Sequence, residues 1–166
     1  MPKLIKLHGH NLAWVDDVFT DVADEEDIPQ GPVILSLARF QAEGDALIGA
    51  NRPVGVRVQA DEEFEALAYD LPRIAVVALV FPKFRDGRHY SAARLLRERY
   101  VYTGEVRAVG DVLLEQARFM IRCGFDAFIP ADGTTPEDWA KAASRYRHVY
   151  QRATDELEPA FVERHR

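Results

Sequence analysis

From residue 33 onward, apolar runs of strand length alternate with segments whose apolar residues recur at the helical period. Such alternation predicts parallel strands that are joined by helical crossovers. The expected fold class is therefore α/β, with an open, mostly parallel sheet of about five strands. The expected strands are 33–36, 54–58, 74–81, 105–109 and 125–129, and the expected helices are 37–48, 61–70, 90–100, 111–123 and 136–153.

The run 74–81 is apolar at every position instead of alternating. Continuous apolar strands are typical of the centre of a parallel sheet, where helices cover both faces. A doubly wound sheet and a partial βα barrel both satisfy the alternation along the chain. We favour the open sheet, because about five βα repeats are too few to close a barrel.

The first 32 residues precede this alternation and have a different pattern. Residues 3–7 and 11–15 predict a short β-hairpin, whose turn contains Gly9 and Asn11, residue types that tolerate positive φ. The segment 16–32 is rich in Asp and Glu, carries two prolines and predicts a solvated acidic loop. We expect one domain, made of this N-terminal part (1–32), an α/β core (33–153) and a charged tail (154–166).

Apolar side chains in the segment 111–123 recur three and four residues apart, which predicts an amphipathic helix. Glu115, Arg118 and Arg122 fall on its polar side and are expected in water. Gly124 then supplies the left-handed residue that commonly ends a helix.

Charge and composition argue against several classes of function. The net charge of −6 disfavours general nucleic-acid binding, which requires a basic face. The N-terminus lacks the apolar stretch of a secretory signal, and no apolar run approaches the ~20 residues of a transmembrane helix. We therefore expect a cytoplasmic protein without a membrane partner.

The single cysteine, Cys123, excludes an internal disulfide, a Cys-x-x-Cys redox pair and an all-cysteine iron–sulfur or zinc site within one chain. The sequence also lacks the glycine-rich fingerprints of dinucleotide and nucleoside triphosphate sites. Its histidines do not have the spacing of metal ligands. We expect no metal and no resident cofactor.

Candidate chemistry is concentrated in the loop that follows the run 74–81. Lys83, Arg85 and Arg88 provide three cations close to a predicted helix start, beside His89. Ligands of open parallel sheets bind beyond the carboxyl ends of the strands, where helix N-termini point outward. Fixed cations at such a place suit a small oxyanion, such as sulfite, sulfate or phosphate, or a carboxylate.

Arg57 and Arg107 could face the same crevice, because they lie in strands expected to flank the run 74–81. A salt bridge across the sheet is the alternative for both, since an arginine in a strand is costly to bury without a partner. The loop cations could likewise be solvated or paired with Asp86, without any ligand.

Asp86 in the loop and Tyr90 at the start of the helix 90–100 are the candidates for catalytic proton transfer. Asp86 could act as an acid or a base, although Asp-Gly is also an ordinary turn pair. Tyr90 could donate a proton, and so could His89, which titrates near neutrality, although a lone histidine is more often incidental. Asp111 is expected to cap the helix 111–123, with a place in the crevice as the alternative.

Three motifs follow one another within residues 54–130: Phe81-Pro-Lys-Phe-Arg-Asp-Gly-Arg-His-Tyr-Ser-Ala-Ala-Arg-Leu-Leu-Arg-Glu-Arg99, Gly104-Glu-Val-Arg-Ala-Val-Gly-Asp111 and Arg122-Cys-Gly-Phe-Asp126. In wording and order they resemble a bacterial family of unknown function, whose members carry the label of an oxidoreductase involved in sulfite reduction. The label reflects genes found beside the gene for the sulfite reductase haemoprotein. The resemblance marks Lys83, Asp86, Gly87, Arg88, Tyr90, Ser91, Arg94, Arg107, Gly110, Asp111 and Gln116, while Glu115 stands where relatives often carry Asp.

The resemblance implies a role in assimilatory sulfite reduction. Reduction of sulfite to sulfide takes six electrons and requires haem and iron–sulfur ligation that one cysteine cannot supply. We therefore expect an accessory protein that binds a small oxyanion or a sulfite reductase subunit; the alternative is a small enzyme, including a cofactor-dependent oxidoreductase, that acts on an anionic metabolite. Homo-oligomerisation stays open. The expected binding residues are Lys83, Arg88, Ser91, Arg57, Arg107 and Asp111, and the expected catalytic residues of the alternative are Asp86 and Tyr90.

Overall fold

The computed structural model describes residues 3–155 and 157–164. Its described residues form one eight-stranded sheet in the order β2-β1-β8-β7-β6-β5-β4-β3. This number corrects the expectation of about five strands. The strands are β1 (Lys3–His8), β2 (Asn11–Asp16), β3 (Thr20–Asp21), β4 (Val33–Ser36), β5 (Val54–Val58), β6 (Val76–Phe81), β7 (Glu105–Gly110) and β8 (Ala127–Phe128), and the α-helices are α1 (Leu37–Gly49), α2 (Arg88–Glu98), α3 (Ala117–Cys123), α4 (Pro136–Ala143) and α5 (Ala160–Glu163).

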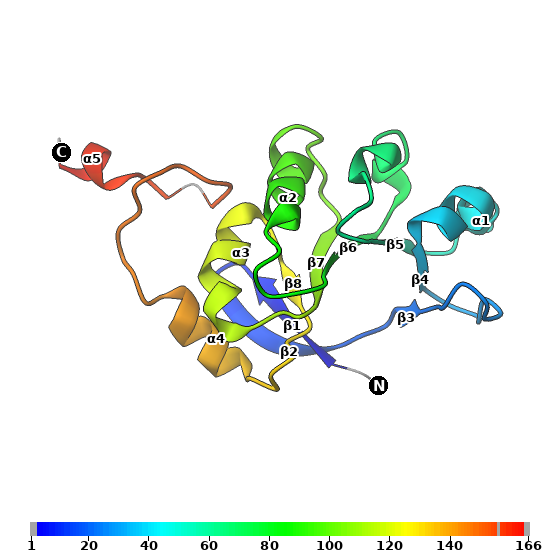
Figure 1. Cartoon of the computed structure of the whole chain (residues 1–166), viewed down its shortest axis with the longest axis horizontal. Helices are drawn as coiled ribbons and strands as arrows, with labels where there is room; N and C mark the ends of the chain where they lie inside the picture. Colours follow the sequence, from blue (N-terminus) through cyan, green and yellow to red (C-terminus); the bar gives the residue numbers. More distant parts are fainter. Residues whose placement is uncertain (1–2, 156, 165–166) are drawn as a thin grey trace.

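Strands β3 to β8 are parallel and lie in chain order, while β1 and β2 form the predicted antiparallel hairpin and join the sheet at β8. Right-handed crossovers that always advance in one direction place their helices on one face of a sheet. Figure 1 shows α1, α2 and α3 as an arc around the outer face of the curled sheet. The sheet is open, as expected, but it is wound as in a partial βα barrel.

This winding overturns the expectation that helices cover both faces of the central strand β6. Its residues Val77, Leu79 and Phe81 belong to the main core beneath the helices. Val76 and Ala78 point to the inner, concave face, where they form a smaller cluster with Ile34 against Phe19, Ala75 and Val109. The run is therefore apolar throughout because a loop segment, rather than a second helix layer, covers part of its inner face.

The acidic segment 16–32 is more ordered than its composition predicts. It contributes the edge strand β3, which pairs with β4, and its Val22 is buried. The amide of Val22 donates a hydrogen bond to the carbonyl oxygen of Ile34 at 3.0 Å. Its carboxylates Asp17 and Asp21 reach Arg107 and Arg57 on the concave face.

Several predicted helices are shorter in the structure. The segment 61–70 contains only the 3-10 turn Phe64–Leu67, and a second 3-10 turn, Leu71–Arg73, follows it. Pro72 has no amide hydrogen to donate, so no α-helix continues through this position. The segment 111–123 begins with a 3-10 turn at Leu114–Gln116 and is α-helical only from Ala117. Gly124 ends α3 with φ of 101°, as predicted.

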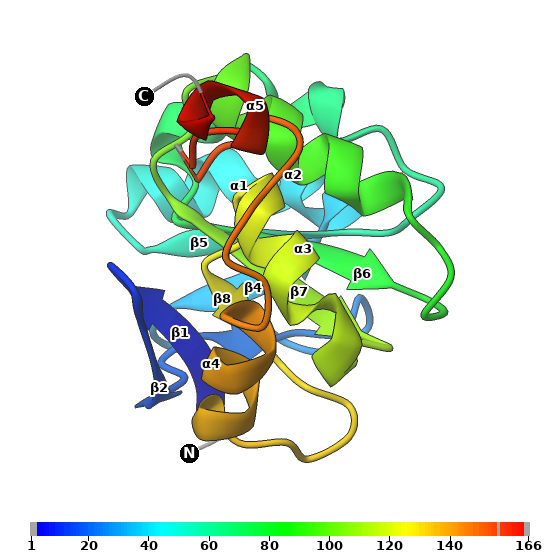
Figure 2. The same ribbon diagram turned by 90° about the vertical axis from the view of Figure 1, so that its left-hand side faces the viewer.

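Helix α4 ends at Ala143 instead of continuing to residue 153. The segment after it carries exposed tyrosines, Tyr146 and Tyr150, and so lacks the apolar stripe that packs a helix. Figure 2 shows this tail running from α4 past α3 to α5. No helix of the described ranges is both long and apolar enough to cross a bilayer.

Candidate functional site

The loop between β6 and α2 is held in place by two side chains from the segment after β7. The carboxylate of Asp111 accepts a hydrogen bond from the amide of Phe84 at 2.7 Å. The side-chain amide of Gln116 donates to the carbonyl oxygen of Phe84 at 3.2 Å. Asp111 therefore orders the neighbouring loop and does not cap α3, which begins six residues later at Ala117.

Lys83, Arg85 and Arg88 line one open hollow of about 500 Å³ in this loop, together with Asp86. All three cations are exposed. Arg88 forms a bidentate ion pair with Asp86, at 2.6 Å and 3.0 Å. Among the described residues, no ion pair neutralises Lys83 or Arg85. The structure thus brings the three loop cations to one surface and leaves two of their charges uncompensated.

The environments of the two proton-transfer candidates differ. The hydrogen bonds from Arg88 lower the pKa of Asp86 to about 2, so this carboxylate is ionised and engaged at neutral pH. Burial raises the pKa of Tyr90, whose ring packs against Phe119 and Phe81 with centroid separations of 4.6 Å and 5.3 Å. Neither group has the near-neutral pKa that suits an acid–base catalyst.

His89 and Ser91 lie on the first turn of α2 but on opposite sides of it. Ser91 is exposed, whereas His89 is 4% exposed and meets Phe81 edge to face at 5.9 Å. Burial lowers the pKa of His89 to about 4. Its Nε2 has no hydrogen-bond partner in the described part of the chain. The nearby backbone groups of Val58 and Gln59 raise the pKa of His89, but the effect of burial is larger. His89 is thus a neutral core residue beneath the loop.

Arg57 and Arg107 do not reach this hollow, because they project from β5 and β7 onto the concave face. Arg107 is 2% exposed and forms a bidentate ion pair with Asp17, at 2.7 Å and 3.1 Å, and a further pair with Glu105 at 2.7 Å. Arg57 forms an ion pair with Asp21. Both arginines therefore make the salt bridges that the sequence left as the alternative.

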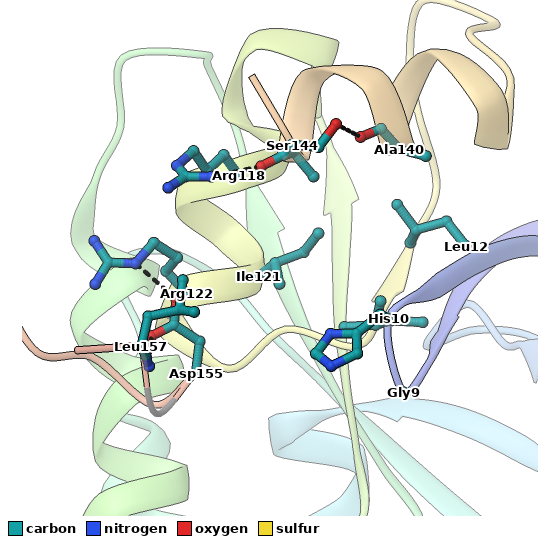
Figure 3. A pocket seen from close by; sticks show the side chains of 12 residues that line it. Gly9, His10, Leu12, Arg118, Ile121, Arg122, Ala140, Ser144, Asp155 and Leu157 are labelled. Atoms are coloured by element: carbon teal, nitrogen blue, oxygen red, sulfur yellow. Dashed lines mark hydrogen bonds and ion pairs between the residues drawn. The ribbon is translucent and has the colours of Figure 1, made fainter. Parts of the chain in front are cut away.

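A second hollow, of about 260 Å³, was not predicted. Figure 3 shows it between the hairpin tip with His10 and Leu12, helices α3 and α4, and the tail. Arg118 donates to the carbonyl oxygen of Ala143 at 2.7 Å, and Arg122 pairs with Asp155 at 2.7 Å. These arginines were expected in water; instead they tie α3 to α4 and to the tail. Their spacing gave no sign of these acceptors, which lie 25 and 33 residues away in the sequence.

Burial raises the pKa of Cys123, which keeps the thiol protonated. Within residues 3–155 and 157–164, no three His, Cys, Asp or Glu side chains gather as metal ligands would.

Comparison with known proteins gives one match. Residues 55–161 match the model of a family described as "Bacterial protein of unknown function (DUF934)". No curated protein and no solved structure matches the chain. The matched range covers the sheet from β5 to β8, the loop with Lys83 and Arg88, and the tail, so the chain belongs to this family of bacterial proteins of unknown function.

Proposed function

We propose that this protein is an accessory of assimilatory sulfite reduction that binds a small oxyanion in the hollow of Lys83, Arg85 and Arg88. The observation that carries the proposal is the pair of uncompensated cations, Lys83 and Arg85, beside the Arg88–Asp86 ion pair. An oxyanion there would supply the negative charge that the protein does not. The link to sulfite comes from the resemblance of the motifs at residues 81–126.

The local backbone supports this choice of ligand. The hollow lies at the start of α2, an 11-residue helix, so the positive end of the helix dipole adds to the side-chain charges. Asp111 and Gln116 fix the loop through Phe84, which reduces the entropy lost when a ligand orders it. Both residues are among those marked by the resemblance.

The protonation states of the two candidate catalytic residues favour an accessory role over catalysis. Asp86 is held as an ionised partner of Arg88, and Tyr90 is held as a neutral hydroxyl. An anion seated near them would meet no group that exchanges protons readily near neutral pH.

Isothermal titration calorimetry with sulfite and sulfate tests the binding. We expect saturable heat for the native protein and at least a tenfold loss of affinity in the variant Lys83→Ala/Arg85→Ala. The variant Lys3→Ala/Lys141→Ala removes the same charge from exposed positions outside the hollow and should bind as the native protein does. Equal losses in both variants would reduce the effect to net charge and contradict the proposal.

The accessory role has its own test. Mixing the protein with purified sulfite reductase haemoprotein should produce a complex in size-exclusion chromatography, and the Lys83→Ala/Arg85→Ala variant should weaken it. Turnover of sulfite by the isolated chain would contradict the role and favour the enzymatic alternative.

A further inference from the structure

The concave face of the sheet carries three cations in a single row. In the strand register, Arg57 pairs with Ala78, Ala78 with Arg107, Arg107 with Ala127, and Ala127 with Lys6. Register partners on neighbouring strands project from the same face. Lys6, Arg107 and Arg57 therefore alternate with the buried alanines Ala127 and Ala78 across β1, β8, β7, β6 and β5.

Three carboxylates neutralise this row, and they come from two sources. Glu105 belongs to β7, within the row, and pairs with Lys6 and Arg107, each at 2.7 Å. Asp17 and Asp21 come from the strap (residues 17–21), which follows β2, crosses the concave face and ends in the edge strand β3. Figure 1 shows this connection running beneath the curled sheet.

With the strap in place, the charges on the concave face cancel, because three cations face three carboxylates. Without Asp17 and Asp21, the same face has two positive charges in excess. We propose that the row of Arg57 and Arg107 is a binding site for a divalent oxyanion such as sulfate or phosphate, and that the strap carboxylates occupy it until the anion displaces them. Guanidinium groups bind planar carboxylates and tetrahedral oxyanions through the same paired hydrogen bonds.

The strap is anchored more weakly than the strands beside it. Its only regular structure is β3, two residues long at the sheet edge, and Val18 is 58% exposed. The guanidinium carbon of Arg107 lies over the ring of Phe19, 5.9 Å from the ring centroid. Displacement would therefore break two ion pairs, the contacts of Phe19 with Arg107 and with the small inner cluster, and a short ladder, while Val22 keeps the end of the strap in the main core.

Arg57 and Asp21 form the open end of the row. The side chain of Asp21 is 56% exposed and that of Arg57 20%, whereas those of Arg107 and Asp17 are 2% and 8% exposed. Desolvation raises the pKa of Asp21, so its place beside Arg57 costs hydration. An anion would reach Arg57 first and Arg107 second, as the strap lifts.

Calorimetric titration with sodium sulfate tests the site in the strap variant Asp17→Asn/Asp21→Asn. It is made in the Lys83→Ala/Arg85→Ala background, so that the outcome does not depend on the loop hollow. We expect at least tenfold tighter sulfate binding than in the background protein, and loss of the gain when Arg57→Gln is added. Asp24→Asn/Asp27→Asn removes the same charge from exposed positions of the adjoining loop and should bring no gain. Asp21→Asn alone, at an exposed position, should give a smaller gain and guards against misfolding of the double variant.

Hydrogen exchange in the native protein decides whether the strap moves. The amides of Thr20 and Val22 donate to the carbonyl oxygens of Pro32 and Ile34, at 3.1 Å and 3.0 Å. Sulfate should accelerate exchange at both amides, while sodium chloride of equal ionic strength should not. If the strap variant gains no affinity, or if it gains affinity while these two amides are unaffected in the native protein, the ion pairs are purely structural and the proposal is overturned.

Discussion

Arg97 and Asp126 form an ion pair of 3.0 Å that joins the end of α2 to the start of β8. The same guanidinium donates to the carbonyl oxygens of Tyr102, Gly104 and Gly124 at 2.6 Å, 2.8 Å and 3.0 Å. One side chain therefore satisfies backbone groups from both connections that flank β7. Such a partly buried network is costly to break, because its acceptors lose their donors together.

Replacement of Arg97 by Ala should lower the free energy of unfolding by about 2–4 kcal/mol, since it leaves Asp126 and three carbonyl groups without this donor. Urea denaturation monitored by circular dichroism measures the change. Arg94→Ala, one turn away, removes an exposed pair with Glu98 and should cost about 0.5 kcal/mol or less. Equal effects of the two substitutions would show that the network adds nothing to an ordinary surface pair.

Loss of the Asp111 carboxylate should loosen the loop of the hollow without unfolding the protein. In Asp111→Ala the amide of Phe84 loses its acceptor, so its hydrogen exchange should quicken and sulfite affinity should fall several-fold. Asp132→Ala removes a carboxylate that accepts from the Leu114 amide and serves as the control. Unchanged exchange at Phe84 would contradict the assigned role of Asp111.

Buried His89 should make stability depend on pH. Its pKa is about 4 in the folded protein and near 6.5 when the chain is unfolded, so between these values the unfolded state binds more protons. The stability that the protein has with a neutral His89 is fully present above about pH 6.5 and is lost as the pH falls toward 4. Thermal melts should show that His89→Phe loses less stability over this range than the native protein. Parallel pH profiles for the two proteins would contradict a neutral, buried imidazole.

Gly110 should tolerate no side chain. Its φ is +93°, and a Cβ would lie 2.4 Å from the carbonyl oxygen of Phe81, a backbone atom that cannot turn away. We expect Gly110→Ala to destabilise the protein by about 2 kcal/mol or more. Gly133 also has a positive φ, +68°, but faces open space, so Gly133→Ala should cost about 1 kcal/mol. Chemical denaturation of the pair separates the steric clash from the backbone strain.

Local patterns predicted those parts of the fold that depend on neighbouring residues. The hairpin of β1 and β2, the parallel strands β4 to β8 and the glycine at the end of α3 all follow from alternation and turn chemistry. The loop at 83–88 was also placed correctly at the carboxyl end of β6, because an apolar strand directly precedes it and a helix directly follows it. Its ligand is a prediction that the calorimetry above addresses.

Strand order and the partners of charged side chains were decided only by the tertiary structure. Five apolar runs fit a doubly wound sheet as well as a singly wound one. An apolar run indicates that a strand is buried, but it does not indicate which element covers it. In the same way, Asp17 has the sequence surroundings of a solvated loop, yet it meets Arg107, 90 residues away, on the concave face. An arginine in a strand requires a counter-charge, and which carboxylate supplies it depends on the path of the chain through space.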